Sequence, residues 1–587
     1  MKLVDNMNTP RLLLLAALLS AGASALAALP AQLPPMPALP APLPQDSVPM
    51  GDSSSAPEVK LALPITAGPF APTWESIEKN YPGTPAWLRE AKFGIWVHFG
   101  PQAAGLSGDW YARRMYTPGT TAYDNHLKNH GHPSRAGYKE MLRDWKPNKL
   151  DPAALTAIYK AAGARFLIVQ GVHHDNFDLW DSRYQPWNST RIGPKRDLLG
   201  EWSKAARAAG MHYGVAFHHE YSWWWWQTAY GSDKEGPLAG VPYDGRLSLA
   251  DGKGTWWEGL DPRRLYNADL REYKGVTAAA NTRWSPPPAG LFSRHEAYAK
   301  WYATQWALRI MDVVDRYDPD FIYTDGTGPQ PFSGSHTGTG IKADATQSVI
   351  ADFYNQTLKR RGKVDTFSVI KFRPTTNGTV NTEEGTIPAG VKTDQAWIAE
   401  TSVGDWYYAP NFSYDSGAVI RYILEQVARD GNVAICVSLL PDGSLDAGSS
   451  RMLKEVGAWM QVNGQGIYGS KAWAVAGEGE DGKLRVLPGG GIDKRQAEFK
   501  FGPKDFRFTV GGDGSLYAFG MMVPAAGSEI RIRSLGKAST LLGKPVNAVT
   551  LLGHTGAPLR WKQEDDALVI TAPAAMPFAS AVAFNIK

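Results

Sequence analysis

A stretch between residues 165 and 201 most constrains what this chain can fold into. It begins with a short apolar run, residues 166–169, which is typical of a fully buried strand. The run is followed by polar and aromatic side chains, namely His173, His174, Asp175, Asn176, Phe177 and Trp180. A buried parallel strand that ends in such side chains is how an α/β barrel builds the floor of its pocket. Aromatic rings beside groups that bind hydroxyls suit a sugar ring better than a phosphate or a nucleic acid, so the stretch indicates both a fold and a class of ligand.

The region between about residues 70 and 470 repeats this alternation of apolar runs and helical patterns. Strands are expected at residues 93–98, 166–170, 213–217, 321–325, 366–370 and 433–437. Helices are expected at residues 151–163, 199–209 and 295–316. Repeated alternation of this length predicts an α/β fold, a (β/α)8 TIM-like barrel, with the active site at the carboxyl ends of the strands. A doubly wound open sheet is the alternative, but no Gly-x-Gly-x-x-Gly follows the first strand.

The end of the chain differs from this region. Residues 475–587 consist of short alternating runs separated by Gly, Pro and Asp, which is a β-sandwich pattern. We therefore predict a catalytic barrel at residues 66–474 and a C-terminal antiparallel β-sandwich domain at residues 475–587. An insertion at residues 223–290 has little periodicity, and we expect a long loop over the barrel mouth there.

The N-terminus carries the pattern of an exported protein. Lys2 and Arg11 precede an apolar segment, and the triplet at residues 25–27 (Ala-Leu-Ala) offers a small-x-small cleavage site. We expect a signal peptide at residues 1–27 and a secreted or periplasmic protein, with the choice between periplasm and exterior left open. Residues 28–65 are rich in Pro, Ala and Ser and are expected to form a linker. No later segment has 18 continuous apolar residues, so no membrane span is predicted.

The amino-acid composition narrows the class of molecule that the protein can bind. The net charge of +4 is spread along the 587 residues, without the Lys/Arg block that nucleic-acid binding requires. The chain has one cysteine, Cys436, in an apolar run, so it forms no intramolecular disulfide. The 22 tryptophans exceed ordinary usage, and sugar-binding proteins often use such side chains as stacking platforms.

Asp325 is the sharpest candidate for a chemical role. The apolar residues 321–323 deliver it to a strand end, and Gly326 then allows a tight turn. A carboxylate there can attack an anomeric carbon and form a glycosyl-enzyme, whereas the alternative is an ordinary capping or loop aspartate. Further side chains at predicted strand ends would converge on the same pocket: His98, His173, His174, His218, His219, Glu220 and Arg373.

A retaining mechanism requires a second carboxyl group about 5–5.5 Å from the first, which donates a proton to the leaving oxygen. The candidates are Glu400, Glu383, Glu384 and Glu220. Spacing along the chain does not choose among them.

The histidines also allow the hypothesis of a metal site. His98 and His174, with either Asp175 or His218, could supply three ligands. His173 and His174 are neighbours on a strand and point to opposite faces, so they rarely bind one ion together. We favour neutral imidazoles that bind sugar hydroxyls, or structural histidines, and predict no metal.

Several motifs resemble the α-L-fucosidases of glycoside hydrolase family 29 and follow one another in the family's order. Residues 87–100 (WLREAKFGIWVHFG) resemble the opening barrel strand, and residues 319–326 (PDFIYTDG) resemble the strand of the nucleophile. Residues 173–180 resemble the family's His-His-(Asp/Glu)-Gly-Phe-x-x-Trp segment. Further matches lie at residues 187–201, 430–443 and 457–469. The resemblance covers about residues 75–475.

The resemblance implies a bacterial, secreted, retaining exo-α-L-fucosidase that releases terminal α-L-fucosyl residues through a covalent glycosyl-enzyme. It implies a fucosylated oligosaccharide or glycoconjugate as substrate, and neither a metal nor another cofactor. Carried over residue by residue, it makes Asp325 the nucleophile and Glu400 the first choice as acid/base. The fucose-binding residues that it implies are His98, Trp110, His173, His174 and Arg373.

The sequence departs from the family pattern near the sugar. Asp109 stands where the family has Glu before Trp-Tyr, and Asn176 stands at the usual Gly. Residues 217–221 read Phe-His-His-Glu-Tyr, where members more often show Tyr and Ser. These changes leave open the linkage, the aglycone and whether the sugar is L-fucose or a relative such as L-galactose. A non-catalytic glycan-binding barrel and a metal-dependent hydrolase are the alternatives from other classes, and the oligomeric state is not indicated.

Overall fold

A computed structural model describes residues 33–41, 57–220, 222–267, 296–325, 332–333, 341–371 and 377–587. The predicted signal peptide lies outside these residues, as do Gly326 and Arg373. Among the described residues, no helix combines the length and the apolar character that crossing a membrane requires.

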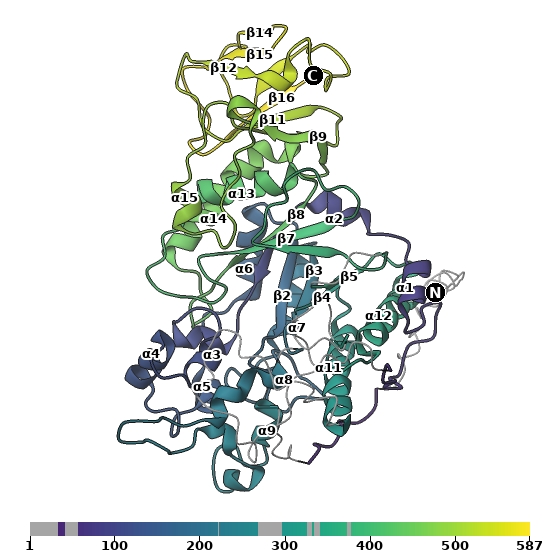
Figure 1. Cartoon of the computed structure of the whole chain (residues 1–587), viewed down its shortest axis with the longest axis vertical. Helices are drawn as coiled ribbons and strands as arrows, with labels where there is room; N and C mark the ends of the chain where they lie inside the picture. The colour runs from purple at the N-terminus through teal and green to yellow at the C-terminus, as the bar shows by residue number, and fades with distance from the viewer. Residues whose placement is uncertain are drawn as a thin grey trace, which may run out of the picture.

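The centre of the molecule is a sheet of eight parallel strands, and the predicted barrel is confirmed (Figure 1). The strands are β1 (Phe93–Val97), β2 (Phe166–Val172), β3 (His212–Phe217), β4 (Phe321–Thr324), β5 (Phe367–Ile370), β6 (Asn381–Glu384), β7 (Trp397–Val403) and β8 (Asn432–Val437). They pair in the order β5-β4-β3-β2-β1-β8-β7-β6. A bridge between Val369 and Val380 joins the two ends of the sheet and closes the barrel. Each strand except β6 is almost wholly buried, which explains the continuous apolar runs of the sequence.

Helices cover the outside of the barrel over most of its circumference. They include α6 (Pro152–Ala161), α7 (Leu198–Ala208), α11 (Glu296–Tyr317), α12 (Ala345–Arg361), α13 (Ser416–Val427) and α14 (Ala447–Asn463). Helix α6 begins as its sequence predicts, because the side chain of Asp151 accepts a hydrogen bond from the Ala154 amide and Pro152 follows the cap. The described residues between β5 and β6, and between β6 and β7, form no helix, so the alternation is incomplete on that side.

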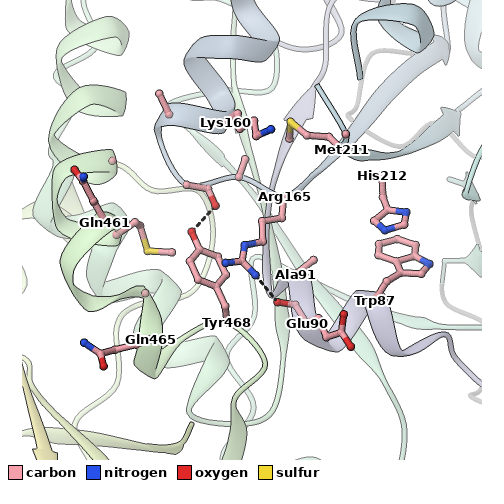
Figure 2. Close-up of a pocket in the computed structure, with 17 residues that line it drawn as sticks. Trp87, Glu90, Ala91, Lys160, Arg165, Met211, His212, Gln461, Gln465 and Tyr468 are labelled. Atoms are coloured by element: carbon pink, nitrogen blue, oxygen red, sulfur yellow. Dashed lines mark hydrogen bonds between the residues drawn. The ribbon is translucent and has the colours of Figure 1, made fainter. Parts of the chain in front are cut away.

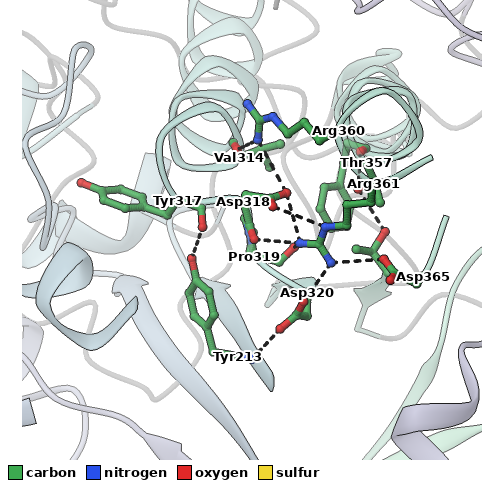
Figure 3. A network of polar contacts seen from close by, with 12 residues as sticks. Tyr213, Val314, Tyr317, Asp318, Pro319, Asp320, Thr357, Arg360, Arg361 and Asp365 are labelled. Atoms are coloured by element: carbon green, nitrogen blue, oxygen red, sulfur yellow. Dashed lines mark hydrogen bonds and ion pairs between the residues drawn. The ribbon is translucent and has the colours of Figure 1, made fainter. Parts of the chain in front are cut away.

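A network of charges fixes α11 and α12 at the amino end of β4 (Figure 3). Arg361, the last residue of α12, donates to Asp320 at 2.9 Å and to Asp365 at 3.2 Å. It also donates to the backbone carbonyls of Asp318 and Pro319. The network lies at the end of the barrel opposite to Asp325, where ion pairs serve stability rather than catalysis.

The insertion after β3 contains short helical turns where the sequence indicated a long loop. They are α8 (Ser222–Trp225), η2 (Trp226–Tyr230), η3 (Asp244–Arg246), η4 (Leu249–Gly252) and α9 (Pro262–Leu265). The buried carboxylate of Asp244 holds them, because it accepts hydrogen bonds from Tyr116 and from Tyr266. The residues of the insertion from 268 onward lie outside the described part of the chain.

The C-terminal region folds as two antiparallel sheets, as its sequence predicts. One has the strand order β13-β16-β11-β10-β9 and the other β12-β15-β14. Their strands are β9 (Lys471–Glu478), β10 (Phe506–Val510), β11 (Leu516–Gly520), β12 (Glu529–Ile532), β13 (Val549–Leu551), β14 (Trp561–Gln563), β15 (Leu568–Thr571) and β16 (Val582–Ile586). An apolar core that includes Phe508, Leu568 and Phe584 separates the sheets.

A buried ion pair joins this region to the barrel. Glu425 on α13 accepts two hydrogen bonds of 2.7 Å from Arg507 on β10. Arg429, one turn further along α13, donates to the same carboxylate at 2.7 Å. All three side chains are fully excluded from solvent.

We predict that Arg507→Met destabilises the protein by about 3–5 kcal/mol, because it leaves the buried Glu425 without one of its two cations. The free energy of unfolding from urea titrations measures the effect. Arg531→Met is the control, since Arg531 pairs with Glu529 and Asp566 at the surface, and its loss should change little. Equal effects of the two substitutions would contradict the structural role of the buried pair.

Candidate active site

Asp325 and Lys371 meet at the carboxyl end of the barrel because their strands are in register. Thr324 at the end of β4 pairs with Ile370 at the end of β5, so the next residue of each strand is Asp325 and Lys371. The Nζ atom of Lys371 lies 2.7 Å from Oδ1 of Asp325. Both side chains are nearly buried, with 10% of Lys371 and 13% of Asp325 exposed.

The charge of Lys371 controls the ionisation of Asp325. Burial on its own would raise the pKa of Asp325, but the ammonium group of Lys371 and the neighbouring histidines together outweigh it and hold this pKa well below its usual range. The imidazoles of His218 and His174 act in the same direction, and Nε2 of His174 lies 3.5 Å from Oδ2. Asp325 is therefore ionised at any physiological pH, as a nucleophile must be.

Two further carboxyl groups surround the same ammonium group. Oε2 of Glu384, at the end of β6, lies 2.6 Å from Nζ of Lys371, and Oε1 of Glu400 on β7 lies 4.0 Å from it. Glu384 and Glu400 are paired neighbours in the parallel register of β6 and β7. The structure thus brings two of the four predicted acid/base candidates to Asp325.

The two carboxyl groups differ in environment. Glu400 is 1% exposed and accepts a hydrogen bond of 2.8 Å from Tyr323. Burial raises its pKa to about 8, against the opposing charge of Lys371, with Glu384 adding to the rise. Glu384 is 38% exposed and so accessible from solvent.

Of the other two candidates, Glu383 is paired elsewhere and Glu220 follows a different strand. Glu383 alternates with Glu384 along β6 and faces the other side of the sheet, where it binds Lys392 at 2.6 Å and Thr386 at 2.7 Å. Glu220 follows β3 and is packed beside α11, whose Tyr302 donates to its backbone carbonyl.

Three histidines form the floor of the site. Ring nitrogens of His98, His173 and His218 all lie within 4.8 Å of one another. Burial lowers the pKa of each histidine far below its usual value, to about 3 for His218, so all three are neutral. Among the described residues, neither ring nitrogen of His98 has a hydrogen-bond partner. Neutral imidazoles with free nitrogens can bind sugar hydroxyls, and the same three could bind a metal ion.

The metal sets considered from the sequence are not the ones that meet. His173 replaces His174 in the cluster, since His174 turns toward Asp325 and its Nδ1 contacts the backbone carbonyl of His218 at 2.8 Å. Asp175 binds the hydroxyl of Tyr138 at 2.6 Å instead.

Aromatic rings form the walls of the candidate site. Trp110 lies edge-on to His174 with ring centroids 5.7 Å apart. Trp225, from the insertion, lies 6.1 Å from Trp110 and 5.8 Å from His174. Trp406 and Tyr407, which follow β7, lie 5.1 and 4.9 Å from His98. Of these four rings, the family resemblance implied Trp110 alone.

Asn176 anchors the insertion to the segment that carries His173 and His174. It adopts a φ of 62°, which explains why an asparagine can replace the glycine that is usual there. Its amide donates to the carbonyls of Arg264 at 2.8 Å and Leu265 at 2.9 Å, and its Oδ1 accepts from Arg309 at 2.6 Å.

We predict that Asn176→Gly lowers the free energy of unfolding by about 1–3 kcal/mol. Glycine keeps the backbone conformation, but a buried N–H of Arg309 loses its acceptor and the Leu265 carbonyl loses a donor, whereas the Arg264 carbonyl keeps Gln185. Urea titration measures the loss, and faster hydrogen exchange at residues 261–267 should accompany it. Asn267→Gly is the matched control, because Asn267 also has a positive φ, of 58°, and its Nδ2 has no hydrogen-bond partner among the described residues. A neutral Asn176→Gly would contradict the anchoring role.

A cavity of about 940 Å³ lies at the other end of the barrel (Figure 2). Arg165, just before β2, and His212, the first residue of β3, are among its lining residues. Trp87 stacks on His212 at 3.9 Å, and the guanidinium of Arg165 lies 3.4 Å from the ring centroid of Tyr468. None of the predicted catalytic residues lines this cavity. Residues at this end of a barrel ordinarily stabilise the fold, whereas catalytic residues lie at the other end.

The structure thus brings together Asp325, Glu400, His98, Trp110, His173 and His174 from the residues predicted by sequence. Arg373 lies outside the described residues. Lys371 is the residue that sequence reasoning missed. The signal that could have found it is its position directly after a buried strand, which matches that of Asp325.

Comparisons with known proteins identify the family of the chain. The chain matches the α-L-fucosidase family over residues 59–465. It is 24% identical to the tissue α-L-fucosidase of Rattus norvegicus over 70% of this chain and 74% of the relative. It is 22% identical to an α-L-fucosidase of Branchiostoma floridae over 84% and 89%.

Solved structures with the same fold include two bacterial fucosidases. One is the Thermotoga maritima α-fucosidase in complex with fucose, with a TM-score of 0.59 and 20% identity over 88% of this chain and 100% of the other. Another is a Bacteroides thetaiotaomicron α-L-fucosidase trapped as a covalent intermediate, with a TM-score of 0.54 and 16% identity over 89% and 98%. The family match extends over most of the chain and includes every strand of the barrel, so this protein belongs to the α-L-fucosidase family.

Proposed function

We propose that the protein is an exo-acting α-L-fucosidase that retains the configuration of the sugar and is exported from the cell. The single observation that carries the retaining mechanism is the ionised Asp325 beside a second, solvent-accessible carboxyl group. The distances of 2.7 and 2.6 Å to one nitrogen place Oδ1 of Asp325 and Oε2 of Glu384 no more than about 5.3 Å apart, which is too close for an inverting enzyme and agrees with the short separation of about 5–5.5 Å in retaining ones.

In the first step, an oxygen of Asp325 attacks C1 of the terminal α-L-fucosyl residue. The bond from C1 to the leaving oxygen breaks, its electron pair stays on that oxygen, and the oxygen takes up a proton from the acid. The neutral imidazoles of His98, His173 and His218 bind ring hydroxyls, and Trp110 and Trp225 enclose the sugar on one side. In the second step, water attacks C1 while the same acid, now ionised, removes a proton from the water.

Two requirements of the acid are met by two different residues. The acid must reach the leaving oxygen on the solvent side, and Glu384 with 38% exposure does so, whereas Glu400 is buried. The acid must also carry a proton near neutral pH, and the pKa of about 8 gives Glu400 that proton. We propose that Glu384 contacts the leaving oxygen and that Glu400, its neighbour in the register, supplies the proton. Glu400, the first choice from sequence, is the alternative for both roles.

Asp325→Gly should lower kcat on an aryl α-L-fucoside at least about 10³-fold, because no covalent intermediate can form. Added azide should restore turnover and give a fucosyl azide of inverted configuration. The product's configuration by NMR decides the assignment. Near-normal activity of the variant without azide would refute the nucleophile.

Glu384→Gln and Glu400→Gln distinguish the two acid roles. Glu384→Gln should lose activity on fucosides with poor leaving groups and keep it on those with good ones, since only the former need protonation. In the wild type, activity should decline as the pH rises through about 8, because Glu400 then loses its proton. This decline should be absent from the pH profile of Glu400→Gln. Glu383→Gln is the matched control, because its side chain faces Lys392 outside the site. A leaving-group-selective loss in Glu400→Gln alone would make Glu400 the acid/base.

A panel of glycoside substrates tests which sugar the protein releases. The proposal predicts hydrolysis of aryl α-L-fucoside and of fucosylated oligosaccharides in preference to aryl α-L-galactoside. Fucoside binding without any hydrolysis would favour the non-catalytic glycan-binding alternative, and loss of activity in EDTA would favour the metal-dependent one.

A further inference from the structure

Lys371 occupies a position at which its one positive charge reaches carboxyl groups on three different strands. Its Nζ atom lies 2.7 Å from Asp325 on the β4 side, 2.6 Å from Glu384 on β6 and 4.0 Å from Glu400 on β7. The distances to the proposed nucleophile and to the proposed leaving-group acid are equal within 0.1 Å. A surface lysine could not hold such a position, because its flexible stem would be solvated.

The burial of this lysine makes its charge effective. Burial on its own would lower the pKa of Lys371, but the carboxylates of Asp325, Glu384 and Glu400 raise it above its usual range, so the side chain stays charged. In an environment with little water, an ammonium ion interacts with its neighbours more strongly than in bulk solvent.

The proposed reaction moves one negative charge across Lys371. Before attack, Asp325 is ionised and Glu400 carries the proton. When an oxygen of Asp325 bonds to C1, this carboxylate becomes a neutral ester, and the proton of Glu400 passes through Glu384 to the departing oxygen. Glu400 is then the anion. Lys371 keeps its own proton throughout, and one of Asp325 and Glu400 is ionised beside it both before and after the step.

We propose that Lys371 is a positioning residue that holds Asp325 beside Glu384 and Glu400, and that the negative charge it stabilises passes from Asp325 to Glu400 as the glycosyl-enzyme forms. This inference rests on the proposed function. It explains how Asp325 and Glu400 keep different protonation states beside one cation: the lysine stabilises whichever of the two is ionised. It also predicts that Glu400 stays ionised once the nucleophile is esterified, because the charge of Lys371 then no longer acts on Asp325. The pair of Glu384 and Glu400 can then take a proton from water.

Other charges near the site have to be included in any test by pH. Within the described part of the chain, several titratable groups face Lys371 or its partners. They are Asp325 and Tyr323 on the β4 side, Glu384 on β6, Glu400 on β7, Tyr422 on α13, His98, His173, His174 and His218 after β1, β2 and β3, and Asp109 before α3 (Tyr111–Arg114). Of these, the histidines are neutral over the working range, since burial lowers their pKa values.

The variant Lys371→Met removes the charge and keeps an unbranched side chain, and Lys371→Arg keeps the charge. In Lys371→Met, the acidic limb of the pH profile of kcat/KM should move upward by at least about one pH unit, because Asp325 loses the cation that holds its pKa down. The rate of hydrolysis of the trapped glycosyl-enzyme should fall at least about tenfold, since the pair of Glu384 and Glu400 loses the cation that keeps it ionised as a base. Lys371→Arg should retain the position of the acidic limb.

Lys392→Met is the matched control, because Lys392 forms a 2.6 Å pair with Glu383, the neighbour of Glu384 on the opposite face of β6. Its pH profile should equal that of the wild type. A Lys371→Met enzyme with an unchanged acidic limb would overturn the proposal, even if its activity were lower.

A second measurement does not depend on turnover. Asp325, with its lowered pKa, stabilises the folded protein above about pH 4 and loses this effect as the pH falls through its folded pKa. The difference in unfolding free energy between wild type and Lys371→Met should therefore be larger at pH 6 than at pH 3. A difference independent of pH would overturn the role of Lys371. A wild type that hydrolyses no α-L-fucoside would instead overturn the proposed function, and the pH dependence of stability would still report on the lysine.

Discussion

The ion pair between Lys371 and Asp325 is the interaction on which the chemistry of this barrel depends. A buried carboxylate without a cation would take up a proton and lose its nucleophilicity. The register of β4 with β5 supplies the cation, because it places the residues that follow the two strands side by side. The end of β6 then brings Glu384 to the same nitrogen. The ends of three consecutive strands thus meet at one nitrogen, and this meeting determines the ionisation of Asp325.

The sequence predicted the parts of the fold that depend on local periodicity. The buried strands appear as apolar runs, and the ends of α6 and α7 follow from their capping residues. Asp325 could be found because an apolar run leads directly to it. The interpretation of the insertion as a loop was incomplete, because its short turns are held by tertiary contacts to Asp244 and Asn176 rather than by a periodic pattern.

Other parts of the site required the three-dimensional arrangement. Lys371 follows its strand just as Asp325 does, but a lone lysine is ordinarily a solvated surface residue, and only the pairing of strands shows that it is buried. The adjacent Glu383 and Glu384 cannot be distinguished by spacing. The direction in which each side chain leaves β6 separates them, since one meets Lys392 and the other Lys371. The three-histidine cluster likewise includes His218, from a segment that departs from the family pattern.

The most direct test of the account is to trap the covalent intermediate. The protein is incubated with 2-fluoro-fucosyl fluoride, digested and analysed by mass spectrometry of its peptides. The account predicts one fluorofucosyl group, attached to Asp325, and much slower loss of this group in Lys371→Met than in Lys392→Met. Attachment to another carboxylate, or complete hydrolysis of fucosides with inversion and no labelled peptide, would contradict it.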